Sequence, residues 1–161
     1  MLFFFNNRMN AFDILMGRCK PTVLKYEGSF DGGSRGNPGL CGAGANISKD
    51  GQEIWSVSEI VATNNTNNYA EYSALILLLN EICNRHISHI KIIGDSQLVI
   101  KQLTGLCKVR CENLIELHRS ASDLMKTITD VELVHVKREL NKRADQLANQ
   151  AMDSYQVSSK S

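Results

Sequence analysis

Hydrophobic and polar positions alternate along the first third of the chain and recur every three to four residues later on. Alternation with β-favouring residues appears at residues 22–30, 42–48 and 53–62. The segment 49–52, between the last two runs, contains Asp50-Gly51, a pair typical of tight hairpins. The sequence therefore predicts three antiparallel strands in succession.

The remainder of the chain has helical spacing that is interrupted by two short strand patterns. After a polar loop at residues 63–68, apolar residues at Ala70, Ala74 and Leu78 begin a predicted helix of about five turns. Further strands are predicted at residues 90–94 and 131–136, and further helices from Asp95-Ser96 through Leu103, at about 111–127 and at 141–152. The order β-β-β-α-β-α-α-β-α predicts an α/β fold with a five-stranded mixed sheet, three antiparallel strands followed by parallel ones, flanked by helices.

Composition limits the classes of partner. A chain of 161 residues, 43% of them apolar, suits one domain that buries its core without disulfides. Its formal net charge of +1 points to no polyanionic partner, so a nucleic-acid site would have to be built locally. The five cysteines are odd in number and lack Cys-x-x-Cys pairs, which favours structural thiols in a reducing compartment over a zinc site.

The two ends of the chain are predicted to lie outside the main domain. Residues 1–21 carry no clear period and form a predicted extension, residues 22–153 form the main domain, and residues 154–161 form a tail. The apolar start is interrupted by Asn6, Asn7 and Arg8, far short of a signal-peptide core or a membrane span. These features favour an intracellular protein without a membrane partner, and no obligate protein partner is evident.

Four acidic residues lie where one predicted element meets the next. Asp31 and Asp95 end the first and fourth strands, and Glu71 and Asp145 fall in the first turns of two helices. If those strands are neighbours, all four can converge at one end of the sheet, although each acid alone has an ordinary interpretation as a cap, a turn residue or a surface charge. Clustered carboxylates repel unless a cation neutralises them, and an all-oxygen set favours Mg²⁺ or Mn²⁺ over zinc.

Four sequence blocks resemble, in order, the active-site blocks of type 1 ribonucleases H. They are DGGSRGNPG at residues 31–39, TNNYAEY at 66–72, GDSQLV at 94–99 and NKRADQLAN at 141–149. The similarity spans about residues 22–152. The resemblance implies a ribonuclease H-like fold in which Asp31, Glu71, Asp95 and Asp145 are the catalytic metal ligands, holding two Mg²⁺ ions with Mn²⁺ as a substitute.

The resemblance also implies an activity and a substrate. It implies an endoribonuclease that hydrolyses the RNA strand of RNA–DNA hybrids by two-metal-ion catalysis, leaving 5′-phosphate and 3′-hydroxyl ends, so no Ser, Cys or His nucleophile is needed. The hybrid is read in its minor groove, where the 2′-hydroxyl distinguishes RNA from DNA. Positions that match the family's substrate contacts are Gly32, Gly33, Ser34, Asn37, Thr66, Asn67, Asn68 and Gln97. Asn67 or Asn68 can equally cap the helix that follows.

Two regions depart from the family pattern. Residues 105–111 form a short connection where many members carry a basic handle, so the chain is similar to handle-less members from archaea, some bacteria and plants. The segment before Asp145 is too short for the family's histidine loop. His135 is expected to end the last strand in a structural role, and Arg138 or Glu139 is the candidate aid to metal or product release.

Two other functions remain open. The same domain occurs within retroelement polyproteins, where flanking reverse-transcriptase sequence would identify it. A catalytically silent hybrid-binding or interaction module should have lost at least one carboxylate, and all four are present.

Overall fold

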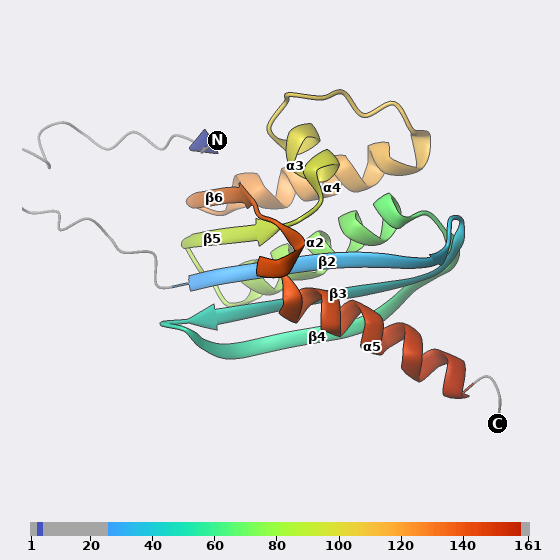
Figure 1. Ribbon diagram of the computed structural model, residues 1–161. Helices are drawn as coiled ribbons and strands as arrows, with labels where there is room; N and C mark the ends of the chain where they lie inside the picture. The colour runs from blue at the N-terminus through green and yellow to red at the C-terminus, as the bar shows by residue number, and fades with distance from the viewer. Residues whose placement is uncertain (1–2, 5–25, 159–161) are drawn as a thin grey trace, which may run out of the picture.

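The computed structural model describes residues 3–4 and 26–158, which form one mixed sheet with helices on both faces (Figure 1). The strands, in the order β1-β6-β5-β2-β3-β4 across the sheet, are β1 (Phe3–Phe4), β2 (Tyr26–Gly36), β3 (Gly39–Lys49), β4 (Gln52–Asn65), β5 (His89–Gly94) and β6 (Asp130–His135). The helices are α2 (Asn67–Asn84), α3 (Gln97–Leu103), α4 (Glu112–Thr127) and α5 (Lys142–Ser158), with a 3₁₀ turn, η1 (Arg138–Leu140), before α5.

The five predicted strands are confirmed, and the first and fourth of them are neighbours. β2, β3 and β4 pair antiparallel, whereas β5 pairs parallel with β2 and with β6. The β3–β4 hairpin turns at Asp50 and Gly51, whose φ angles are 52° and 81°, as the Asp-Gly pair predicts. A sixth strand, β1, pairs antiparallel with β6; it was not predicted, because two residues carry no periodic pattern.

Two predicted loops were wrong because strand pairing extends farther than hydrophobic alternation does. β2 does not stop at Asp31 in a glycine-rich turn. It continues to Gly36, paired with β3 over its whole length, and the turn is only Asn37-Pro38. Similarly, β4 extends to Asn65 and α2 begins at Asn67, so the polar loop predicted at residues 63–68 is reduced to Thr66.

The last helix is longer than predicted, and part of the predicted N-terminal region lies outside the residues that the structure describes. α5 continues beyond residue 152 to Ser158, through much of the predicted tail. Residues 22–25 of the predicted first strand, and residues 5–21 of the predicted extension, lie outside the described residues. The division of the chain into an extension, a catalytic domain and a tail stays a prediction.

The main core lies between the sheet and α2, which is buried along one side. Tyr72, Leu75 and Leu79 of this helix are fully buried against sheet residues such as Phe30. Such burial contributes roughly 1.5–3 kcal/mol for each large apolar side chain. α2 is thereby fixed against β2, and any side chain on its inner face has a defined position relative to the sheet.

Helix α5 covers the opposite face and crosses β3 and β4 in the front of Figure 1. Its first turns approach β3 closely, because a Cβ atom at Gly44 would lie 2.3 Å from Ala144 O and 2.4 Å from Ala148 N. Only glycine permits this backbone-to-backbone distance. The approach places the start of α5, and Asp145 with it, beside β2 and β3.

Two features of the described part of the chain concern its cysteines and its helices. Its cysteines, Cys41, Cys83, Cys107 and Cys111, are free thiols, and Cys19 lies outside it. No helix within residues 26–158 combines the length and apolar character that crossing a membrane requires.

Candidate active site

The parallel strands of the sheet end beside Asp31. β5 ends at Gly94, which lies opposite Phe30 of β2 and opposite His135, the last residue of β6. β2 continues past the end of β5, so Asp31 is the first β2 residue beyond their pairing, and Asp95 directly follows β5. In α/β proteins, the carboxyl ends of parallel strands are the usual place for a ligand site.

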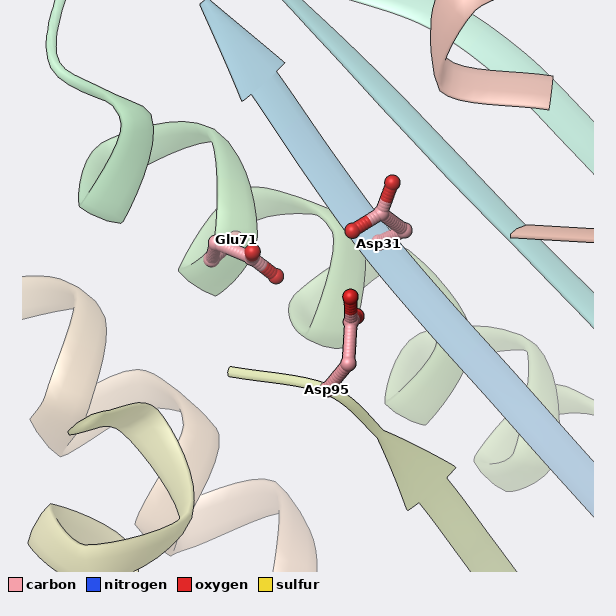
Figure 2. A group of neighbouring side chains, drawn as sticks. All are labelled: Asp31, Glu71 and Asp95. Carbon is pink, nitrogen blue, oxygen red and sulfur yellow. The ribbon is translucent and has the colours of Figure 1, made fainter. Parts of the chain in front are cut away.

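Asp31, Glu71 and Asp95 point toward one another from β2, α2 and the residue after β5 (Figure 2). One carboxylate oxygen of each residue lies within 4.8 Å of those of the other two. Asp31 and Glu71 are each only 5% exposed, and Asp95 is partly buried. The structure therefore brings together three of the four acids that the sequence singles out.

Burial and mutual repulsion destabilise the ionised form of this cluster. Burial, and next the charges of Asp95 and Asp145, raise the pKa of Asp31 to about 8. The pKa of Glu71 is also well above its usual range, first because of burial and then because of Asp31 and Asp95. The Gly32 N–H donates to Glu71 Oε2 at 3.3 Å, which offsets this in part. A divalent cation would relieve the repulsion, and an all-carboxylate set fits a hard ion such as Mg²⁺.

Asp145 lies in the first turn of α5, as predicted, but outside the group of three carboxylates. Its carboxylate accepts a hydrogen bond from the guanidinium of Arg138 in η1, and the two side chains form an ion pair. Asp145 is nevertheless close enough to raise the pKa of Asp31 by charge repulsion. Arg138 and Glu139 are both exposed in η1, beside this fourth acid.

Glu71 reaches the cluster from the second turn of α2, so its predicted place in the first turn was wrong. The helix begins at Asn67, and Thr66 is its N-cap, with a side-chain hydroxyl that accepts a hydrogen bond from the Tyr69 N–H at 3.3 Å. Thr66 therefore takes the capping role expected of Asn67 or Asn68. The cap fixes where the helix starts and hence which residue faces Asp31.

Gly32 explains how β2 and α2 come close enough for Asp31 and Glu71 to meet. A Cβ atom at Gly32 would lie 2.1 Å from both Ala70 C and Glu71 N, so the strand packs directly on the helix backbone. The family resemblance implies only a substrate contact for Gly32, and that assignment stays a prediction. The structure adds a packing reason for glycine at this position.

Substitution of Gly32 by alanine is expected to lower the free energy of unfolding by about 3 kcal/mol or more, at the upper end of overpacking costs. The added methyl group can be accommodated only if β2 and α2 move apart. Urea denaturation followed by circular dichroism measures the loss. Gly33→Ala is the matched control, because its methyl group would meet only the flexible end of Met152 at 3.1 Å. Equal stability of the two variants would contradict the packing argument.

The predicted substrate residues of the first two blocks lie side by side. The Asn67 N–H donates to Asn37 Oδ1 at 3.2 Å, and Ser34 Oγ lies 3.0 Å from the Asn65 carbonyl oxygen. The first contact joins the β2–β3 turn to the start of α2, and the second joins β2 to the end of β4. Gln97 belongs to a different element and is exposed at the first position of α3.

Removal of the Thr66 hydroxyl is expected to destabilise the protein by about 1 kcal/mol, the usual cost of losing an N-cap. Thr66→Ala loses the hydrogen bond to the Tyr69 N–H, whereas Thr66→Ser retains an acceptor at the same place. The midpoint of urea unfolding should therefore fall for alanine and stay near the original value for serine. A serine variant as unstable as the alanine variant would show that the hydroxyl is not the cause.

Two further residues contact Asp95. His135 ends β6, as predicted, and its Nε2 lies 3.2 Å from the Asp95 backbone oxygen. Asn141 was not predicted as a site residue. Its Nδ2 lies 2.8 Å from Asp95 Oδ1 and 2.8 Å from the Phe30 carbonyl oxygen. Its position at the start of the fourth block, one helical turn before Asp145, is the signal that could have identified it.

Known proteins are similar to this chain in both sequence and fold. A family model described as reverse transcriptase-like matches residues 29–151. Ribonuclease HI from Halobacterium salinarum is 41% identical over 125 residues, which cover 77% of this chain and 62% of that protein. This chain belongs to the type 1 ribonuclease H family. The chain spans less than two thirds of the length of the Halobacterium salinarum ribonuclease HI that it matches.

Solved structures of ribonucleases H superpose on the same domain. The crystal structure of RNase H1 from the halophilic archaeon Halobacterium salinarum gives a TM-score of 0.76 at 39% identity, over 80% of this chain and 98% of that one. The structure of LC11-RNase H1 in complex with an RNA/DNA hybrid gives a TM-score of 0.75 at 32% identity, over 81% of this chain and 99% of that one. The family and the fold inferred from the four sequence blocks are therefore confirmed.

Proposed function

We propose that this protein is a metal-dependent endoribonuclease that hydrolyses the RNA strand of RNA–DNA hybrids and leaves 5′-phosphate and 3′-hydroxyl ends. The observation that carries the proposal is the convergence of Asp31, Glu71 and Asp95, with carboxylate oxygens within 4.8 Å of one another, in a chain of the ribonuclease H family. LC11-RNase H1 was solved in complex with an RNA/DNA hybrid, and we extend that class of substrate to this chain.

Asp31, Glu71, Asp95 and Asp145 are the proposed ligands of two Mg²⁺ ions, for which Mn²⁺ can substitute. The raised pKa values of Asp31 and Glu71 support this assignment, because burial and then neighbouring carboxylates destabilise their ionised forms, which a bound cation would stabilise. When bound, such a pair of ions lowers the pKa of an attacking water and stabilises the departing oxygen of a phosphodiester.

The chain's own contribution is to hold these carboxylates in place and to limit the access of water. Gly32 lets β2 pack on the backbone of α2, so Asp31 and Glu71 have a fixed relative position. Burial of both side chains lowers the local dielectric constant and strengthens their attraction for a cation. Arg138 and Glu139 are proposed as auxiliary groups. The guanidinium of Arg138 compensates the charge of Asp145, and its side chain is 71% exposed and thus accessible to a phosphate.

The hybrid is proposed to lie along the edge where the first two sequence blocks meet. Backbone groups, hydroxyls and amides from these blocks make contacts that do not depend on base sequence. The proposed contact residues are Gly32, Gly33, Ser34, Asn37, Thr66, Asn67, Asn68 and Gln97. The contact between Asn37 and Asn67 supports this, since it joins the two blocks into one continuous polar edge. Recognition of the 2′-hydroxyl there would direct cleavage to RNA.

The proposal is tested by incubating the protein with Mg²⁺ and three end-labelled substrates: an RNA–DNA hybrid, duplex DNA and duplex RNA. We expect cleavage of the RNA strand of the hybrid, suppressed by EDTA, with products that a phosphatase converts to 5′-hydroxyl ends. Equal cleavage of all three substrates, or cleavage that resists EDTA, would contradict the proposed activity. Binding of the hybrid without cleavage would favour a silent binding module.

A further inference from the structure

The amide of Asn141 lies between the segments that carry three of the four acids. Its Nδ2 donates to Asp95 Oδ1 and to the carbonyl oxygen of Phe30, the residue before Asp31, at 2.8 Å each. Its backbone oxygen accepts a hydrogen bond from the Asp145 N–H at 3.1 Å. One residue therefore connects β2, the end of β5 and the first turn of α5.

We propose that Asn141 is a positioning residue that orients the Asp95 carboxylate for metal binding. This rests on the proposed function in one respect, namely that Asp95 is a metal ligand. The side chain of Asn141 is only 2% exposed, so it has no surface for contact with an RNA–DNA hybrid. Its effect on catalysis must therefore pass through Asp95 and the segments that it connects.

An amide suits this role better than the other polar side chains do. The NH₂ group supplies two hydrogen-bond donors without a net charge. A lysine or arginine in its place would neutralise Asp95 and compete with a cation, and an aspartate would add repulsion. Asn141 therefore fixes one oxygen of the Asp95 carboxylate while leaving its negative charge available to an ion.

The other half of the amide argues against a role in packing alone. Asn141 Oδ1 is buried and has no hydrogen-bond partner among the described residues. An unsatisfied buried acceptor costs stability, and an apolar side chain of similar shape would avoid that cost. The donor group, not the shape of the side chain, therefore accounts for asparagine at this position.

The test compares Asn141→Leu, which keeps the approximate volume, with Asn141→Ala, which does not. Binding of Mn²⁺ to the protein alone is measured by titration calorimetry. Both variants are expected to bind about 10–100-fold more weakly, the usual effect of removing a group that orients a metal ligand. The kcat for hybrid cleavage should fall by a similar factor, and KM for the hybrid should stay unchanged because Asn141 does not contact it.

Two controls separate positioning from general damage. Ile82→Val shortens a fully buried core side chain of α2 away from the acids, and it should leave Mn²⁺ affinity unchanged. Asn80→Asp changes an exposed asparagine of α2 and should also leave Mn²⁺ affinity unchanged. Restoration of wild-type Mn²⁺ affinity by leucine would show that only volume matters and would overturn the proposal.

A measurement on the unmodified protein keeps the proposal testable even if both variants unfold. In NMR spectra, the side-chain NH₂ signals of Asn141 should shift on addition of Mg²⁺, whereas those of Asn80 should not. Unshifted Asn141 signals at saturating Mg²⁺ would overturn the proposal. A wild-type protein that binds metal but leaves the hybrid intact would instead refute only the proposed function.

Discussion

Replacement of Asp95 by asparagine is expected to reduce hybrid cleavage by on the order of a thousandfold. A metal ion stabilises the transition state by several kcal/mol, and each 1.36 kcal/mol corresponds to about a tenfold change in rate. Asparagine keeps the shape of the side chain but removes the charge that attracts the ion. The rate is measured on a labelled RNA–DNA hybrid at saturating Mg²⁺, and circular dichroism checks that the variant is folded.

Asp123→Asn is the matched control for this prediction. It makes the same chemical change on α4, where the Asp123 carboxylate only forms an exposed ion pair with Lys126 at 2.9 Å. Such pairs contribute little to stability, so this variant should cleave the hybrid at the wild-type rate. Full activity of Asp95→Asn would show that Asp95 is not a metal ligand.

The metal-free protein is expected to lose stability as the pH rises from about 4 to about 8. The pKa of Asp31 is raised from 3.8 to about 8 in the folded state, first by burial. Between these values Asp31 holds a proton in the folded protein that it releases in the unfolded chain. Asp31 therefore makes the free energy of unfolding fall with pH, by about 1.4 kcal/mol per unit at most. The contribution of Asp31 to this loss should be complete above about pH 8, where Asp31 is ionised in both states. Glu71, whose pKa is also raised by burial, adds to the loss in the same direction.

Divalent metal should reverse this effect. Thermal unfolding in EDTA and in Mg²⁺ is compared at about pH 5 and about pH 8, and Mg²⁺ should raise Tm more at the higher pH because the ligand is then ionised. Asp31→Asn removes the buried charge, so in EDTA its Tm should exceed that of the wild type at about pH 8. A difference of 1 kcal/mol corresponds to roughly 2–4 °C for a domain of this size. A Tm of the wild type in EDTA that is independent of pH would contradict the raised pKa.

Most of the fold could be predicted because each element carries its own periodic pattern. The Asp50-Gly51 hairpin and the apolar spacing of α2 are local signals, and both elements formed where expected. The errors occur where pairing with a neighbour continues a strand beyond its hydrophobic pattern. The residues after Asp31 are rich in glycine and therefore predict a turn, but β3 pairs with them as far as Gly36.

The candidate site was predicted less completely than the fold. Sequence blocks identified the acids, and strand order explained how Asp31 and Asp95 meet. The ion pair between Arg138 and Asp145, and the bridge from Asn141 to Asp95, depend on where η1 and α5 begin relative to β2. No periodic pattern encodes those contacts, because they join residues from separate elements.

The sequence by itself determined the elements, their order and the identities of the acids. These follow from side-chain periodicity and from residue types that act locally. Only the tertiary structure decided how deeply the acids are buried, how close they lie to one another and, as a result, their pKa values. Burial of Asp31 and Glu71 and their distance from Asp95 set the raised pKa values, since desolvation and charge repulsion depend on surroundings that distant parts of the chain supply.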